Sequence, residues 1–304
     1  DRAQIVENVF RGNEGGFAGG PSHSLIARNT FTSNARYGLR LTGFGGVTNS
    51  ARGAQYSIVT ENVFSNNGTI VDAVNGYGDI RLDDQFDGLQ STNRFFDNSV
   101  ASTVNVFNRE TSGELIDFSG NWWGSSANPE SSGRILGLGA AGIDHTPWLD
   151  RGADIAPGLS GFQGDFSVLH VDDDSPQTGT KGRVQEGVDL VSGSTVNIAA
   201  GTYAEPVNIE GKAGLTLNGE DKTTVIMQPT STLCTNVSTW GCGRTVVFRV
   251  VSSTDVVMQN MTFDFSIIKG NNVMGLLIWD STCTVNNNIL KNMSASDAAG
   301  PQLS

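Results

Sequence analysis

One short pattern of apolar and polar residues recurs along the chain. An apolar residue is followed by two variable residues, an asparagine, one further residue and then an aromatic or aliphatic residue. Successive asparagines of the pattern lie roughly 21 to 33 residues apart, which suits one coil of a solenoid better than a hairpin of a sandwich. Clear copies are residues 5–10, 26–31, 59–64, 118–123 and 285–290, and looser copies surround Asn93 and Asn260.

The spacing inside the pattern requires a bend. Alternate residues of a strand point to opposite faces, so an apolar residue and an asparagine three positions later cannot both lie inside one straight strand. Asparagine tolerates the left-handed conformation of such a corner, and asparagines stacked on successive coils can hydrogen-bond along the axis. The pattern therefore predicts a parallel β-solenoid with an asparagine ladder. The predicted ladder residues are Asn8, Asn29, Asn62, Asn93, Asn121, Asn260 and Asn288.

The composition supports an all-β chain. Among 304 residues there are 38 glycines and only 16% charged residues, while 38% are hydrophobic, which is too apolar for a disordered chain. The net charge of -12, with no basic stripe, excludes a nucleic-acid partner and argues against an anionic membrane surface. No apolar run approaches the roughly 20 residues of a spanning helix, so we expect no membrane span.

Two segments resemble parts of one known family. Asn121-Trp122-Trp123-Gly124, followed by Thr146-Pro147-Trp148-Leu149, resembles the closing segment of right-handed parallel β-helix proteins. These proteins form the pectate-lyase-like superfamily and occur in large bacterial and archaeal surface proteins. Residues 182–191, with Val184, Val188 and Val191 on one helical face, are similar to the capping helix that opens such a fold. Residues 194–203 resemble its first coil.

The order of these segments predicts an unusual domain organisation. Residues 1–149 would be the C-terminal coils and closing segment of one right-handed parallel β-helix, and residues 165–304 the N-terminal cap and first coils of another. Residues 150–164, which carry Pro and Gly, would link them.

Each open end of such a stack would expose unpaired backbone groups, so something must cover it. We consider three arrangements: neighbouring segments of a longer tandem array, head-to-tail association of copies, or stacking of the chain's own halves. A linker of about 15 residues spans at most roughly 50 Å, which makes the last only marginally feasible. In the first two, residues 165–304 of one repeat and 1–150 of the next complete one capped β-helix.

Acidic clusters are the candidates for chemistry. On a strand within residues 78–88, Asp79, Arg81 and Asp83 would share an outward face, with Asp84 beside it. These carboxylates could bind calcium, the one cofactor we consider, or Arg81 could act as a base beside a uronate carboxyl. A solvated face with an Asp–Arg ion pair explains the same residues more simply.

A second acidic cluster and several other side chains are candidates for binding or modification. Asp172, Asp173 and Asp174 fit either a calcium loop or a turn with helix-capping acids. Cys234 and Cys242 flank a short loop and could form a disulfide, whereas Cys283 lies in a strand pattern and reads as a buried thiol. Sequons for N-glycosylation occur at Asn67, Asn236 and Asn292, and a fourth match at Asn260 reads as a corner residue.

These observations favour a structural or adhesive module at the cell surface or outside the cell, whose partners are copies of itself. The rival hypothesis is a carbohydrate-active β-helix: a lyase, a hydrolase or a binding module that acts on acidic polysaccharide. The sequence favours the non-enzymatic hypothesis, because the closing segment of one β-helix precedes the opening segment of another and because no acidic cluster forms a convincing active site.

Overall fold

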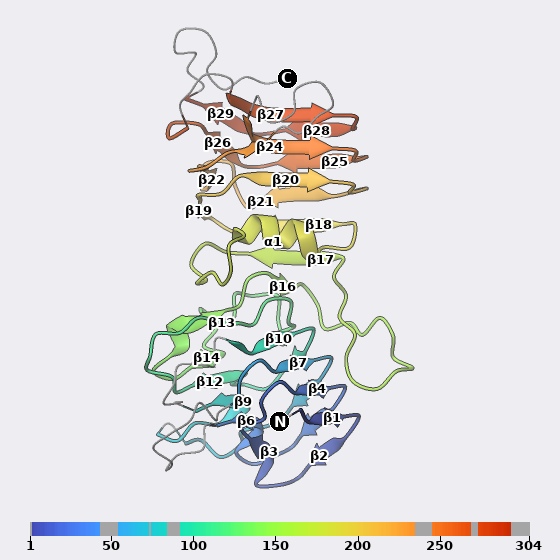
Figure 1. The fold of residues 1–304 in the computed structure, drawn as a ribbon, viewed down its shortest axis with the longest axis vertical. Helices are drawn as coiled ribbons and strands as arrows, with labels where there is room; N and C mark the ends of the chain where they lie inside the picture. The colour runs from blue at the N-terminus through green and yellow to red at the C-terminus, as the bar shows by residue number, and fades with distance from the viewer. Residues whose placement is uncertain are drawn as a thin grey trace. The chain divides into compact units, whose positions relative to one another are not determined.

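The computed structural model describes residues 2–42, 54–72, 74–83, 92–234, 245–268 and 273–292. The chain divides into two compact units (Figure 1). Unit 1 consists of Asp1–Asp165 together with Ser175–Thr178, and unit 2 consists of Phe166–Asp174 together with Gly179–Ser304.

Unit 1 is built from three parallel sheets, and consecutive strands visit the sheets in turn. We call three consecutive strands a rung, so that each strand pairs with the equivalent strand of the next rung.

The first sheet contains, in order, β1 (Gln4–Val6), β4 (Leu25–Ala27), β7 (Ile58–Thr60), β10 (Arg94–Phe96), β13 (Ile116–Asp117) and β15 (Ile143–Asp144). The second contains β2 (Val9–Arg11), β5 (Thr30–Thr32), β8 (Val63–Ser65) and β11 (Ser99–Val100). The third contains β3 (Gly15–Gly19), β6 (Tyr37–Leu41), β9 (Gly78–Leu82), β12 (Val106–Asn108) and β14 (Ile135–Leu136). The short helix η2 (Ala140–Gly142) and the strand β16 (Trp148–Leu149) complete the unit.

The core of unit 1 is a set of apolar columns that run from rung to rung. Inward positions such as Ile26, Val59 and Phe95 are fully buried because the strand alternation keeps every second side chain inside. The rings of Phe10, Phe31 and Phe64 stack with centroids 4.8 and 4.7 Å apart. These spacings match the distance between paired strands, so in-register pairing also sets the aromatic stack.

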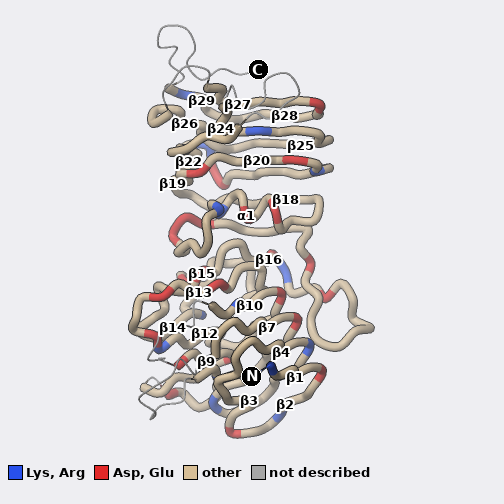
Figure 2. Tube along the Cα trace, in the orientation of Figure 1, with Lys and Arg blue, Asp and Glu red and all other residues tan. Residues whose placement is uncertain are grey.

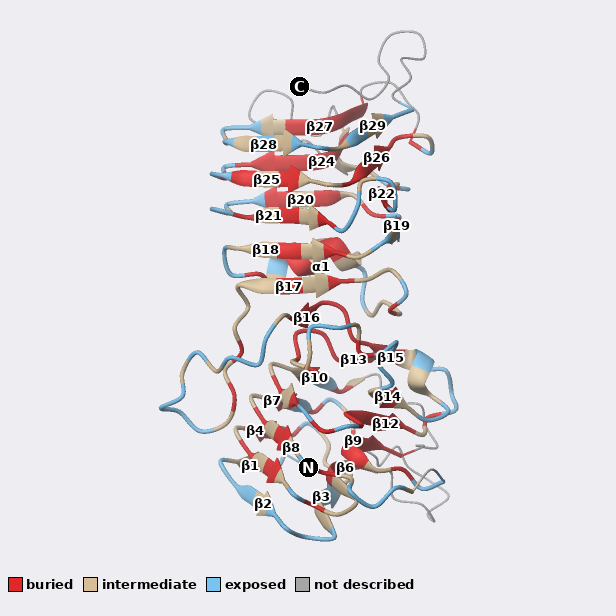
Figure 3. Ribbon diagram, turned by 180° about the vertical axis from the view of Figure 1, so that it is seen from behind, coloured by how far each residue is buried: buried red, intermediate tan, exposed pale blue. Residues whose placement is uncertain are grey.

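Unit 2 repeats the same plan. One sheet contains β17 (Val168–Val171), β18 (Thr195–Ile198), β21 (Thr216–Gly219), β25 (Val256–Gln259) and β28 (Cys283–Asn286). The second contains β19 (Gly201–Tyr203), β22 (Val225–Met227), β26 (Thr262–Asp264) and β29 (Ile289–Lys291). The third contains β20 (Val207–Glu210), β24 (Thr245–Val251) and β27 (Val273–Trp279), and β23 (Leu233–Cys234) pairs antiparallel with β24. Figure 3 shows buried positions along most of these strands and exposed positions at the turns between them, whereas β28 and β29 contain no buried residue.

Helix α1 (Arg183–Leu190) packs on β17, β18 and β20 of unit 2 through its valine face. Val184 and Val188 are buried, as the helical spacing predicts. The helix begins at Gly182 without a capping side chain of its own. Instead the carboxylate of Glu205 accepts hydrogen bonds from the backbone N–H groups of Val184 and Gln185, both at 2.9 Å.

The predicted linker is not a free spacer. Phe162 is only 3% exposed, and its backbone N–H donates to the carbonyl of Glu61 at 2.9 Å. The backbone N–H of Gly164 donates to Oδ1 of Asp97 at 2.7 Å. Residues 150–164 therefore fold back on the corners of unit 1, because they carry an apolar anchor and backbone donors that match groups already there.

The cysteines differ in state. Cys234 is disulfide-bonded, whereas Cys283 is free and half-buried, and burial raises the pKa of its thiol to about 11. Cys242, the predicted partner of Cys234, lies outside the described residues. In the described part of the chain, no helix has the length and apolar character needed to cross a bilayer.

We expect Glu205→Ala to destabilise unit 2 by about 1–2 kcal/mol, because two N–H groups at the start of α1 would lose their acceptor. A Cβ at Gly182 would lie 2.0 Å from Oε2 of Glu205, so Gly182→Ala should displace the same carboxylate and give a similar loss. Urea unfolding followed by circular dichroism measures both changes.

The double variant provides the control for this prediction. Because both substitutions remove one cap, the double variant should lose little more than either single variant. Fully additive losses would show that Gly182→Ala acts through something other than the Glu205 cap.

Candidate functional site

The recurring asparagines of unit 1 form a hydrogen-bonded ladder at one corner of the rungs. Each Oδ1 accepts from both the backbone N–H and the side-chain Nδ2 of the asparagine one rung earlier. Asn8 donates to Asn29 at 2.9 and 3.1 Å, and Asn29 donates to Asn62 at 2.9 and 3.0 Å. Asn62 continues to Asn98 at 3.0 and 2.9 Å, and Asn98 to Asn121 at 2.8 and 3.0 Å. The side chains from Asn29 onward are buried, so their amides serve the fold.

Asn98 occupies the ladder position predicted for Asn93. Asn93 lies at another corner, where its Oδ1 accepts from the backbone N–H of Ser57 at 3.0 Å. Ser57 in turn accepts from the backbone N–H of Ser24 at 3.2 Å, so this corner has a ladder of its own. The Asn93-Arg94-Phe95 stretch resembles the pattern because, at both kinds of corner, an asparagine comes shortly before a strand.

The left-handed residue of each corner is the one before the asparagine, not the asparagine itself. Glu7, Arg28, Glu61 and Asp97 have φ between 53° and 60°, and Gly120 has φ 71°. A left-handed residue bends the chain at the corner, and the asparagine after it directs its amide along the stack.

A second asparagine ladder lies five residues further on and was not predicted. The backbone N–H of Asn13 donates to Oδ1 of Asn34 at 3.1 Å, and the N–H and Nδ2 of Asn34 donate to Oδ1 of Asn67 at 3.1 and 2.9 Å. Ser102 accepts from the N–H of Asn67 and takes the next position. A constant offset of five residues from Asn8, Asn29 and Asn62 is the sequence signal that could have identified it.

The predicted glycosylation sites have different surroundings. Asn67 is 5% exposed, and its Nδ2 donates to the carbonyl of Phe31 and to Asp79. The prediction of N-glycosylation at Asn67 is therefore wrong. Asn236 lies outside the described residues. Nδ2 of Asn292 donates to Oδ1 of Asp264 at 2.7 Å, and the two residues that complete its sequon lie outside the described part of the chain.

In unit 2 the corner pattern is shifted by one residue at Asn260. Asn260 has φ 61° and is itself the left-handed residue, while the backbone N–H of Met261 donates to Oδ1 of Asn288 at 3.0 Å. Asn288 thus lies where the pattern placed it. Nδ2 of Asn260 donates to Oδ1 of Asn218 at 3.0 Å, and Nδ2 of Asn287 donates to Oδ1 of Asn260 at 2.7 Å.

The predicted acidic face on β9 contains a group of arginines around one carboxylate. Nε of Arg81 lies 2.7 Å from Oδ1 of Asp83, Nε of Arg40 lies 2.6 Å from Oδ2, and an Nη of Arg109 lies 3.3 Å from Oδ1. Burial opposes the ionisation of Asp83, but the hydrogen bonds from Arg81 and Arg40 outweigh it and lower the pKa of Asp83. The guanidinium of Arg81 is held by Asp83, so Arg81 is unsuited to act as a base.

Asp79 is sealed in a polar pocket of its own. It is fully buried and accepts from Nδ2 of Asn67 at 2.9 Å, from the N–H and Oγ of Ser102 at 2.9 and 2.5 Å, and from Nδ2 of Asn105 at 3.3 Å. Burial raises the pKa of Asp79 to about 6 against these hydrogen bonds. The predicted solvated face is therefore wrong for Asp79, because side chains of the next rung cover it. Asp84 lies outside the described residues.

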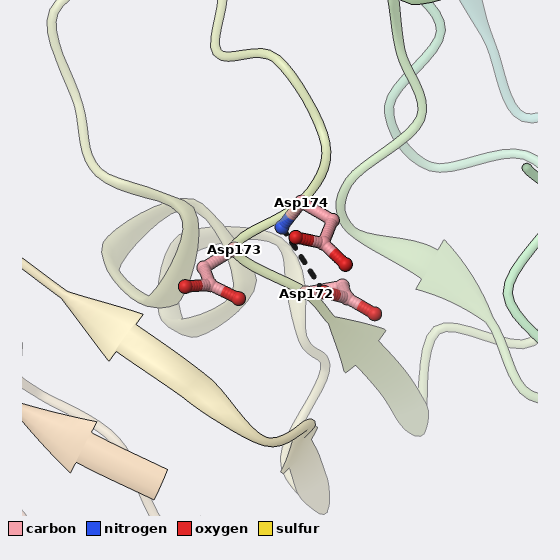
Figure 4. A group of neighbouring side chains, drawn as sticks. All are labelled: Asp172, Asp173 and Asp174. Carbon is pink, nitrogen blue, oxygen red and sulfur yellow. Dashed lines mark hydrogen bonds between the residues drawn. The ribbon is translucent and has the colours of Figure 1, made fainter.

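Asp172, Asp173 and Asp174 form the one group of possible metal ligands found in the described part of the chain, with oxygens all within 4.8 Å of one another (Figure 4). The backbone N–H of Asp174 donates to Oδ1 of Asp172 at 3.1 Å, and Oδ2 of Asp173 accepts from the N–H of Thr202 at 2.7 Å. These contacts hold a turn beside β19. The predicted turn is present, and a carboxylate that accepts hydrogen bonds at the start of α1 belongs to Glu205.

Comparison of the chain with protein-family models, with curated proteins and with solved structures gives no match.

Charged residues also occupy the left-handed positions of successive rungs, and Figure 2 marks the charged residues by colour along the chain trace. Arg28 pairs with Glu7 of the preceding rung at 3.0 Å and with Glu61 of the following rung at 3.4 Å. The next residue in this column is Asp97, another acid. Burial, together with the charges of Glu61 and Asp154, raises the pKa of Asp97 to about 6, although the N–H of Gly164 donates to it.

We expect Asn62→Ala to destabilise unit 1 by about 2–3 kcal/mol, because buried donors and acceptors of two neighbouring rungs would lose their partners. Urea unfolding followed by the fluorescence of Trp122, Trp123 and Trp148 measures this change. Asn8→Ala, at the exposed first position of the ladder, is the matched control and should cost less than about 1 kcal/mol. Equal losses would contradict a ladder that is stabilised by burial.

We expect Asp97→Asn to stabilise unit 1 by about 1 kcal/mol at pH 7.5. The folded pKa of about 6 lies above the ordinary value of 3.8, so the folded state binds more protons and wild-type stability falls as pH rises through this window. Asparagine keeps an acceptor for Gly164, suits the left-handed position and carries no charge.

Unfolding free energies of this pair measured from pH 4.5 to pH 8 test the prediction. The difference between the two proteins should shrink as the pH falls towards 4.5, where Asp97 of the folded state is largely protonated. Asp72→Asn is the control, because hydrogen bonds from Asn75 lower the pKa of Asp72, and this variant should show no gain at high pH. A difference at Asp97 that is constant with pH would contradict the proposed electrostatic cause.

Proposed function

We propose that both units are portions of right-handed parallel β-helices of the pectate-lyase-like type. We further propose that the chain is a structural or adhesive module at the cell surface or outside the cell, assembled in tandem or head to tail. Three parallel sheets visited in turn by consecutive strands, in each unit, support the β-helix part of this proposal.

The functional part rests on one observation: the polar residues that recur once per rung serve rung-to-rung hydrogen bonds. From Asn29 to Asn121 the corner amides are buried, and each Oδ1 accepts two hydrogen bonds from the preceding rung. A repeat whose polar positions are used in this way is suited to long stacks. This use of polar groups favours a structural role over a chemical one.

The side chains considered for catalysis are engaged in the same manner. Arg81 is paired with Asp83, and Asp79 is closed off by four hydrogen bonds. Neither group is left to exchange a proton with a substrate or to coordinate an ion without breaking these contacts. The engagement of Arg81 and Asp79 in these contacts favours the hypothesis of a structural module over that of an enzyme.

Assembly of the purified chain tests the structural proposal. We expect light scattering to show species that grow with concentration, and electron microscopy to show linear particles. A stable, monodisperse monomer over the whole concentration range would contradict assembly by copies of this chain.

The enzymatic alternative is tested separately with a panel of uronate polymers, with and without calcium. We expect no increase in the absorbance of unsaturated products above that of heat-treated protein. Product formation that is abolished by Arg81→Ala would overturn the proposed function.

A further inference from the structure

Within the described residues, the first rung of unit 1 and the last rung of unit 2 each have one edge without a paired strand. β1 pairs with β4 and β2 with β5, while β28 pairs with β25 and β29 with β26. In the described residues these four strands have no partner on their other side. Such edges present rows of backbone donors and acceptors and are templates for the addition of further strands.

The asparagine ladder has a direction, and its two ends are complementary. At each step, a backbone N–H of one rung donates to the Oδ1 of the next. Within the described part of the chain, Oδ1 of Asn8 accepts no hydrogen bond, because no rung precedes it there. At the other end, Oδ1 of Asn288 accepts from Met261, but the backbone N–H of Asn288 has no described acceptor. One end thus offers an acceptor and the other offers a donor of the same ladder.

The two edges also agree in register. With Asn288 placed over Asn8, the residues that precede them are both left-handed: Asn287 has φ 48° and Glu7 has φ 60°. Val285 then lies over Ile5, and Leu290 lies over Phe10. All four of these apolar residues are half-buried, as residues at the end of a core would be.

We propose that the β28–β29 edge of one molecule stacks, parallel and in register, on the β1–β2 edge of a second copy of this chain. The N–H of Asn288 donates to Oδ1 of Asn8, and the apolar pairs close the two cores. The contact is heterologous, so it leaves a free edge of each kind and propagates. This inference rests on the proposed function and adds to it the surfaces and the register.

The charges at this contact predict its salt dependence. In the proposed register Lys291 lies over Arg11, and each chain carries a net charge of -12. The interaction between Lys291 and Arg11 and the interaction between the net charges of the two chains are both repulsive, and salt screens both of them. We therefore expect association to strengthen as the ionic strength rises.

A disulfide tests the register directly. The same alignment places Cys283 over Ala3, and residues in register on paired parallel strands lie about 4.8 Å apart, within the range that a disulfide spans. Under mild oxidation we expect Ala3→Cys to give a ladder of covalent multimers on non-reducing gels. The ladder should disappear in the Ala3→Cys, Cys283→Ser double variant.

Gln4→Cys is the matched control, because its side chain is one residue out of register and points to the opposite face. Equal cross-linking of Ala3→Cys and Gln4→Cys would overturn the register. We also expect Asn8→Ala, compared with wild type at equal thermal stability, to weaken association about tenfold by light scattering.

The outcomes separate this inference from the proposed function. Assembly of the Ala3→Cys variant without a cross-link to Cys283 would overturn the proposed register. It would leave the structural function standing and would show that copies associate through other surfaces. Absence of assembly together with uronate cleavage would contradict both.

Discussion

The structure depends on how the backbone N–H at each corner of a rung finds an acceptor. The N–H of the asparagine after each left-handed residue donates to a side-chain oxygen of the next rung instead of a backbone carbonyl, so backbone pairing alone would leave it without a partner. Leaving a buried N–H unpaired costs roughly 1–3 kcal/mol. In unit 1 the asparagine of the next rung supplies the acceptor, and its Nδ2 satisfies carbonyls such as that of Ile26 in return. The ladder therefore makes stacking of the next rung a condition for a stable corner.

This condition explains how residues other than glycine can occupy four of the five left-handed positions of the ladder, the fifth being Gly120. A left-handed conformation costs roughly 1–2 kcal/mol for such a residue. At these positions the side chain points outward, where Arg28 pairs with the acids of both neighbouring rungs. Ion pairs of this exposure contribute little each, so the buried ladder supplies most of the stabilisation. The ion pairs mainly determine which residue types are tolerated at the corner.

The sequence pattern predicted the rungs well and their side-chain environments poorly. The spacing of Asn8, Asn29 and Asn62 identifies successive rungs, because one asparagine per rung is a physical requirement of the corner. The prediction missed Asn98, although residues 95–100 fit the whole pattern, because Asn93-Arg94-Phe95 places an asparagine and an aromatic residue at the same spacing five residues earlier. Other features depend on contacts between distant residues. Glu205 caps a helix that begins more than twenty residues before it, and Ser102 and Asn105 cover Asp79 from the next rung. A local pattern describes one strand and the turn after it, and it carries no information on which neighbouring rung covers an outward side chain.

Three carboxyl groups that are shielded from solvent make the stability of unit 1 depend on pH. Burial raises the pKa of Asp79, Asp97 and Asp144 to about 6, and all three lie in unit 1. Asp144 accepts from the N–H and Oγ1 of Thr178 at 2.6 and 2.7 Å, so its position is fixed by the strand end and by residues 175–178. Because the folded pKa of each group exceeds its ordinary value of 3.8, protonation between about pH 6 and pH 4 favours the folded state. These three groups therefore contribute more stability in mildly acidic surroundings than at neutral pH, whereas the lowered pKa of Asp83 acts in the opposite direction. The stacking that shields polar groups from solvent determines both effects.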